Sequence, residues 1–139
     1  MSDLSVEEKS RPRLRFVLLF HRVSDSFIDQ QDRGSHWDLL LEHENQLASW
    51  AIDENPFDNE SRPVVAIKIH PHRMEYLEYE GPVSNDRGSV TRHERGVFRW
   101  LTNGRNEVVL DIQGERAKGI IRMERVAGDA WHVTFERSG

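Results

Sequence analysis

The sequence predicts an all-β fold, an antiparallel β-barrel of about eight or nine short strands with little helix. Three observations favour it: apolar residues recur mostly at every second position, the apolar runs are short, and Gly, Asn, Asp or Pro interrupt them. This alternation is typical of half-buried strands joined by turns. Closure into a barrel is favoured because it removes exposed strand edges.

The elements follow in order from these patterns. Residues 1–13 are charged, include Pro12 and show no periodicity, so we expect a flexible N-terminal arm followed by one barrel domain over 14–139. Strands are predicted over 14–21, 36–42, 47–52, 64–70, 88–93, 97–101, 107–112, 119–125 and 131–136. Tight turns are predicted at 43–45, 94–96, 102–105, 113–115 and 127–129. The longer loops 22–35 and 53–63 have a length that often serves function.

Composition limits the chemistry. The 139 residues include 19 Lys and Arg, 24 Asp and Glu and no Cys, for a net charge of −5. Without Cys, only His and carboxylates remain as plausible metal ligands. The lack of Cys also suits a protein of the reducing cytoplasm. The excess of acidic residues argues against nucleic-acid binding over a large part of the surface, so any such contact is expected to be local. No stretch resembles a signal peptide or membrane helix, and we expect a cytoplasmic protein without a membrane partner.

The segment from His36 to Glu42 is the most informative part of the chain. On a strand, His36 and Asp38 lie on one face, opposite the apolar face of Trp37, Leu39 and Leu41. The pair is half of a metal site, and a solvated polar face is the alternative. His21 ends the first apolar run and lies beside His36 if the intervening loop joins neighbouring strands. Two imidazoles and a carboxylate suit Mn²⁺, Zn²⁺ or another divalent transition metal better than Ca²⁺.

A second polar cluster surrounds the end of the 64–70 strand. His72 and Tyr76 carry donors suited to phosphate oxygens, and such a His can act as a general acid or stabilise a transition state. A polar strand exit with a half-buried Tyr is the alternative. Arg87 and Arg92 could line a substrate groove, although an Arg in a turn is often simply solvated. The remaining polar and aromatic candidates are predicted to be structural: His43, His93, His132, Trp37, Trp50, Trp100 and Trp131.

Blocks of sequence spread along the chain, taken in order, carry a family resemblance. An apolar strand ends in His21, and His36-Trp37-Asp38 and Ser49-Trp50-Ala51 follow. The later blocks are His72, Tyr76, Tyr79, Glu80 and Gly81, then Arg87-Gly88-Ser89-Val90 through Arg95-Gly96-Val97-Phe98. From about Arg15 to Glu136 the chain resembles the 3′-phosphoesterase domain of bacterial DNA ligase D, including small stand-alone proteins built on that domain.

The resemblance implies a β-barrel enzyme that uses Mn²⁺ to remove a 3′-phosphate or 3′-ribonucleoside from nucleic-acid ends in DNA repair. It implies that His21, His36 and Asp38 are metal ligands and that His72 and Tyr76 contact the scissile phosphate. The implied partners are 3′ ends of DNA or of RNA–DNA primers, together with other DNA-repair proteins.

Two departures from the family pattern support a different function. Leu40 stands where the ligase domain commonly has Arg, and Asp53-Glu54-Asn55 replaces a Lys-bearing segment. Because Leu40 cannot pair with a phosphate, a catalytically weakened metal- or nucleic-acid-binding barrel is the alternative hypothesis. A metal-dependent enzyme acting on a small phosphorylated or carboxylated molecule is a third hypothesis, favoured by the acidic net charge.

Overall fold

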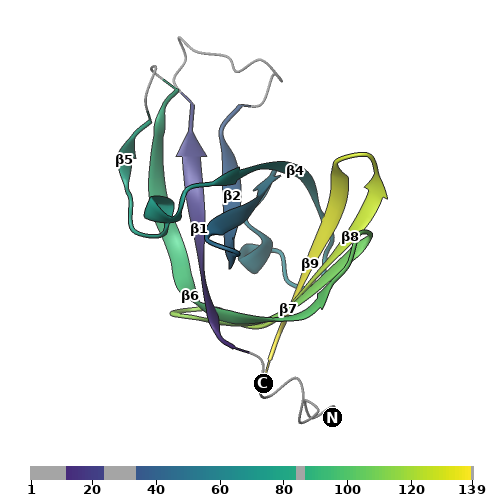
Figure 1. Cartoon of the computed structure of the whole chain (residues 1–139). Helices are drawn as coiled ribbons and strands as arrows, with labels where there is room; N and C mark the ends of the chain where they lie inside the picture. Colours follow the sequence, from purple (N-terminus) through teal and green to yellow (C-terminus); the bar gives the residue numbers. More distant parts are fainter. Residues whose placement is uncertain (1–11, 24–33, 84–86, 139) are drawn as a thin grey trace.

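Eight antiparallel strands close into a barrel, and a ninth strand of two residues, β5, extends the sheet beyond β6 (Figure 1). This computed structural model describes residues 12–23, 34–83 and 87–138. The strand order is β1-β2-β3-β4-β9-β8-β7-β6-β5, and pairing of β1 with β6 closes the ring. The predicted all-β antiparallel barrel is therefore confirmed.

The strands and the two short 3₁₀ turns have the following bounds: β1 (Leu14–Arg22), β2 (His36–His43), β3 (Gln46–Ile52), η1 (Pro56–Asp58), β4 (Val64–His72), η2 (Met74–Leu77), β5 (Gly81–Pro82), β6 (Ser89–Asn103), β7 (Glu107–Gly114), β8 (Lys118–Ala127) and β9 (Ala130–Arg137). The first strand starts at Leu14 as predicted. Residues 1–11 of the expected arm and 24–33 of the first long loop lie outside the described part of the chain.

The barrel interior is an apolar core to which all eight main strands contribute. It includes Phe16, Leu39, Trp50, Phe98 and Phe135, each at most 2% exposed. The second long loop, residues 53–63, covers part of this core. Its 3₁₀ turn η1 packs Phe57 against Phe135, with ring centroids 4.9 Å apart. The alternation read from the sequence therefore separates an inward apolar face from an outward face in most strands.

A smaller apolar cluster lies on the opposite, outward face of the first strands. Its buried members are Val17, Leu19, Leu40, Leu47, Leu77 and Val90. Leu77 belongs to η2, which contacts β1. Because His36 and Asp38 share the parity of Leu40 along β2, the outward face also carries the polar residues predicted for the site. Leu40 is fully buried, so it serves as a packing residue on this face.

One predicted turn is wrong. Residues 94–96 do not reverse the chain, because the predicted strands 88–93 and 97–101 are parts of the single strand β6. Between Leu18 and Leu19 of β1 the register with β6 shifts, which marks a β-bulge around His93. Gly96 is needed for close backbone approach: a Cβ there would lie 2.1 Å from the carbonyl oxygen of Gln113. Glycine in this strand therefore signals close packing of backbones, not a turn.

The other predicted hairpin connections are confirmed. At the β2–β3 connection Glu44 and Asn45 have φ of 51° and 65°, the positive pair that a two-residue hairpin turn requires. Short connections also join β6 to β7, β7 to β8 and β8 to β9. None of the described residues forms a helix long and apolar enough to cross a membrane.

Candidate metal centre

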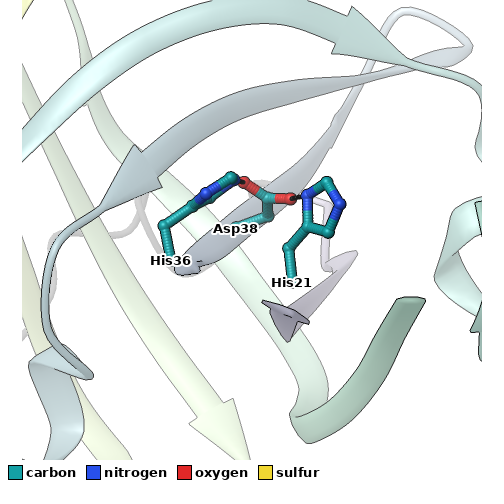
Figure 2. Close-up of side chains that lie close together, drawn as sticks. All are labelled: His21, His36 and Asp38. Carbon is teal, nitrogen blue, oxygen red and sulfur yellow. Dashed lines mark ion pairs between the residues drawn. The ribbon is translucent and has the colours of Figure 1, made fainter. Parts of the chain in front are cut away.

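His21, His36 and Asp38 meet at one end of the β1–β2 pair. The register places His21 directly opposite His36, as the sequence predicted, and Asp38 two residues further along β2. One ligand atom from each of the three side chains lies within 4.8 Å of the others, and Figure 2 shows the carboxylate between the two rings. His36 and Asp38 are buried, and His21 is half-buried.

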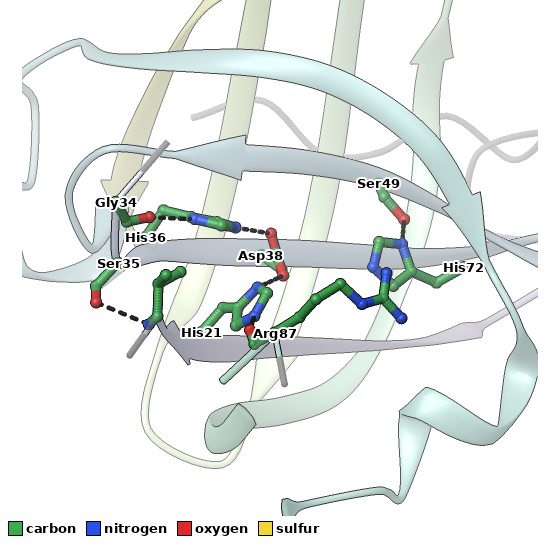
Figure 3. A network of polar contacts seen from close by, with 9 residues as sticks. His21, Gly34, Ser35, His36, Asp38, Ser49, His72 and Arg87 are labelled. Carbon is green, nitrogen blue, oxygen red and sulfur yellow. Dashed lines mark hydrogen bonds and ion pairs between the residues drawn. The ribbon is translucent and has the colours of Figure 1, made fainter. Parts of the chain in front are cut away.

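Each imidazole has one nitrogen fixed by a backbone carbonyl. His36 Nδ1 lies 2.8 Å from the oxygen of Gly34, and His21 Nε2 lies 2.8 Å from the oxygen of Arg87 (Figure 3). Since a carbonyl oxygen can only accept, these nitrogens carry the ring proton. The other nitrogens, His36 Nε2 and His21 Nδ1, face Asp38 with a lone pair when the rings are neutral. Fixing the outer nitrogen in this way is the usual arrangement of metal-binding histidines.

The Asp38 carboxylate lacks adequate partners. His36 Nε2 lies 3.1 Å from its Oδ1, and His21 Nδ1 lies 3.7 Å from its Oδ2. Oδ1 is buried and accepts no hydrogen bond from the described residues. Neutral imidazoles present lone pairs to this anion, so a cation held among the three side chains would stabilise the carboxylate. The donor set fits a divalent transition metal.

A β-bulge in β4 brings His72 to the same outward face. Between the pairs Ser49↔Ile69 and Leu47↔His72, β4 has one residue more than β3, which shifts the parity of the strand. His72 Nδ1 consequently lies 2.8 Å from Ser49 Oγ. Ser49 donates its single hydroxyl proton to the oxygen of Leu47 at 2.7 Å, so His72 Nδ1–H donates to Ser49 and leaves Nε2 as an acceptor.

Burial lowers the pKa of the His72 imidazole below its ordinary value. The Asp38 carboxylate opposes this shift, whereas His21 and His36 add to it. These electrostatic effects indicate that His72 belongs to the same site as the three candidate ligands. At neutral pH the free protein therefore holds His72 mainly uncharged.

Tyr76 and Tyr79 continue the site from His72. The Tyr76 ring, on η2, lies edge-on to His72 with centroids 5.4 Å apart, and Tyr79 lies 5.7 Å from Tyr76 in the same manner. Tyr76 also packs against the outward cluster that contains Leu77. The structure thus brings the two predicted catalytic residues, His72 and Tyr76, into contact.

The two predicted substrate-binding arginines lie on the rim of this face. Arg87 is exposed, and Figure 3 shows its side chain extending from beside His21 in the direction of His72. Arg92 pairs with Leu19, which in turn pairs with Asp38, so these three residues form one row across β6, β1 and β2. Glu54, the acidic departure noted in the sequence, is compensated by Arg62 at 2.9 Å.

The groups that orient the imidazoles cannot be predicted from the sequence alone. The Gly34 and Arg87 carbonyls are backbone atoms and leave no signal in residue type. Ser49 could have been found, because it stands in the Ser-Trp-Ala block and lies on the outward face of β3. Its contact with His72, however, depends on the β4 bulge, which the sequence does not show.

Comparison with known proteins identifies the family. The family model for the DNA Ligase D 3′-phosphoesterase domain matches residues 29–131. The chain belongs to this family. His36, Asp38, His72 and Tyr76 fall within the matched range, and His21 precedes it.

Several curated proteins are similar to this member of the family. The multifunctional non-homologous end joining protein LigD of Mycobacterium bovis is 29% identical over 116 residues, covering 77% of this chain and 15% of that protein. LigD of Mycobacterium tuberculosis H37Rv, described as a DNA repair protein, has the same identity and coverage. LigD of Pseudomonas aeruginosa is 25% identical over 92 residues, covering 60% of this chain and 11% of that protein. The chain thus spans a small part of the length of these relatives.

Proposed function

We propose that the protein is a metal-dependent 3′-phosphoesterase that removes a 3′-phosphate or a 3′-ribonucleoside from nucleic-acid ends in DNA repair. The single observation that carries the proposal is the buried Asp38 carboxylate facing two oriented imidazoles with an oxygen that accepts no hydrogen bond from the described residues. Membership of the 3′-phosphoesterase family and the end-joining names of its relatives support the substrate class.

His21 Nδ1, His36 Nε2 and a carboxylate oxygen of Asp38 would hold the cation, which we propose is Mn²⁺, with Zn²⁺ or another divalent transition metal as alternatives. When bound, the cation would polarise a phosphoryl oxygen and neutralise charge developing there. The Gly34 and Arg87 carbonyls keep the two rings in the orientation that ligation needs.

His72 and Tyr76 would contact the scissile phosphate. In the free protein His72 Nε2 is an acceptor, so it must gain a proton to donate to a phosphate oxygen. An incoming phosphate favours that charged form, because its negative charge opposes the desolvation that keeps the ring neutral. The imidazolium would then stabilise the transition-state charge, with the Tyr76 hydroxyl as a second donor.

Arg87 and Arg92 would supply the remaining positive charge along the substrate strand. Both lie on the outward face beside β1, next to the three candidate ligands. We propose 3′ ends of DNA or RNA–DNA primers as the partners of this face, and other DNA-repair proteins as further partners. Such local contacts agree with an acidic protein, whose net charge is −5.

Purified protein with Mn²⁺ is expected to convert a labelled primer ending in a 3′-phosphate or a 3′-ribonucleotide into a 3′-hydroxyl product. The His72→Gln variant should keep Mn²⁺-induced thermal stabilisation but lose turnover by about 10²-fold or more, since it lacks an ionisable donor. Denaturing gel electrophoresis of the primer measures the product.

The His70→Gln variant is the matched control, because His70 is exposed on the same strand, and it should retain activity. Primer that is bound but unchanged under all metal conditions would contradict the phosphoesterase and favour the catalytically weakened binding barrel. Loss of metal binding in the His72 variant would show that its proposed role is wrong.

A further inference from the structure

A cavity of about 470 Å³ opens at the end of the barrel remote from His21 and His36. The connections β2–β3, β6–β7 and β8–β9 surround it, and antiparallel pairing places all three at the same barrel end. The β1–β2 connection, beside which His21 and His36 lie, is at the other end. The cavity shares no lining residue with the candidate metal centre.

Three of the four tryptophans line this cavity. Trp50 and Trp131 are buried and meet edge to face, with ring centroids 5.9 Å apart. Trp100 is half-buried and offers the most accessible aromatic surface, beside His43 at 5.5 Å. All three are predicted from the sequence to be structural; Trp50 and Trp131 are buried in the core, whereas Trp100 only packs against it. Indole surfaces in a cavity suit a planar π-system such as a nucleobase.

Positive charge exceeds negative charge around the same opening. Lys68, Arg105 and Arg125 line it, against a single carboxylate from Asp129. Lys68 Nζ lies 4.0 Å above the Trp50 ring, and burial lowers the pKa of this lysine, with Asp129 opposing the shift. Arg105 is exposed and makes no ion pair or hydrogen bond with the described residues. A ligand anion would compensate the partly desolvated ammonium and pair with Arg105.

We propose that this cavity binds a nucleoside monophosphate group, either a free nucleotide or one unpaired nucleotide of a single strand. The base lies against Trp100, and the phosphate binds Lys68 and Arg105. The cavity volume is within the range of ordinary small-molecule sites, about 300–1,000 Å³. Trp50 adds a buried indole N–H that has no acceptor among the described residues, so a ligand oxygen reaching it would be bound more tightly.

The test uses the full chain labelled with ¹⁵N and titrated with dAMP, with adenosine, with inorganic phosphate and with short oligo(dA). The indole N–H cross-peaks of Trp50, Trp100 and Trp131 should shift saturably with dAMP, while that of Trp37, outside the cavity, stays in place. Adenosine and phosphate should each bind more weakly than dAMP, because each lacks one half of the recognised group. The oligo(dA) arm distinguishes a nucleotide within a strand from a free nucleotide.

Two variants test the charge contacts. Lys68→Met and Arg105→Ala should each weaken dAMP binding about fivefold or more, the effect of losing one charge-assisted hydrogen bond. Lys118→Met and Arg122→Ala remove exposed cations elsewhere on the barrel and should leave binding unchanged. Because Arg105 lies on an exposed turn, its variant should fold even if the Lys68 variant does not.

Three results would overturn the proposal: no saturable shift with either dAMP or oligo(dA), equal binding of adenosine and dAMP, or equal binding of phosphate and dAMP. Unchanged affinity in the Arg105 variant would also contradict it. None of these readouts depends on metal or on turnover, so a failure here is distinguishable from a failure of the proposed phosphoesterase activity.

Discussion

The Asp38→Asn variant should lose metal-induced stabilisation while its metal-free form stays as stable as the wild type or becomes more stable. The wild-type carboxylate is buried, and its Oδ1 accepts no hydrogen bond from the described residues. An amide N–H can donate to an imidazole lone pair, and the substitution removes a buried charge that lacks full compensation. With Mn²⁺ at about 100 times its Kd, the wild type should gain about 2.7 kcal/mol, or roughly 10 °C in Tm.

Differential scanning fluorimetry with EDTA or with a Mn²⁺ series measures both effects. Asp53→Asn is the matched control, because Asp53 is an exposed carboxylate at the end of β3, and it should retain the full metal-induced shift. A full shift in the Asp38 variant would contradict the assignment of this carboxylate as a ligand. A large loss of stability in its metal-free form would mean that protonated imidazoles already pair with Asp38.

The Glu94→Ala variant should be destabilised by about 3 kcal/mol, because this buried side chain caps the β7–β8 connection. Oε1 accepts the backbone N–H groups of Arg95 and Glu115, and Oε2 accepts those of Arg116 and Ala117, all at 2.8–2.9 Å. Glu94 is only 4% exposed, so water replaces these bonds poorly. Urea unfolding of the metal-free protein measures the change in free energy.

Two further variants separate capping from charge. Glu94→Gln keeps one acceptor oxygen but places an amide N–H group against two backbone N–H groups, which are also donors. This variant should therefore lose a large part of the stability that the alanine variant loses. Glu115→Ala removes only an exposed partner of Arg95 and should change the free energy of unfolding by less than about 1 kcal/mol. Equal effects of the Glu94 and Glu115 alanine variants would refute the capping role.

Glu94 also shows where the sequence reading of the fold failed. The Glu-Arg-Gly segment predicts a turn, because turns favour glycine and polar residues. Here Gly96 allows two backbones to approach closely, and Glu94 is inward-facing because the bulge near His93 shifts the parity of β6. Such close approaches depend on the neighbouring strand, so local sequence gives no sign of them.

The candidate site is predictable where strand periodicity alone determines the face of the sheet to which a side chain points. The His-x-Asp spacing puts His36 and Asp38 on one face, and hairpin pairing of the first strands brings His21 beside them. Residue type and the family resemblance place His72 in the site, but the direction of its side chain follows from the β4 bulge, which simple alternation does not reveal. The carbonyls that fix the two rings belong to the backbone and required coordinates.

The most direct test of a cation between His21, His36 and Asp38 is anomalous diffraction from crystals soaked with Mn²⁺ at about pH 8, where the imidazoles bind metal in their neutral form. We predict one strong manganese peak bounded by His21 Nδ1, His36 Nε2 and the Asp38 carboxylate. The absence of a peak at this position under saturating Mn²⁺, with the three side chains still converging, would contradict the metal centre.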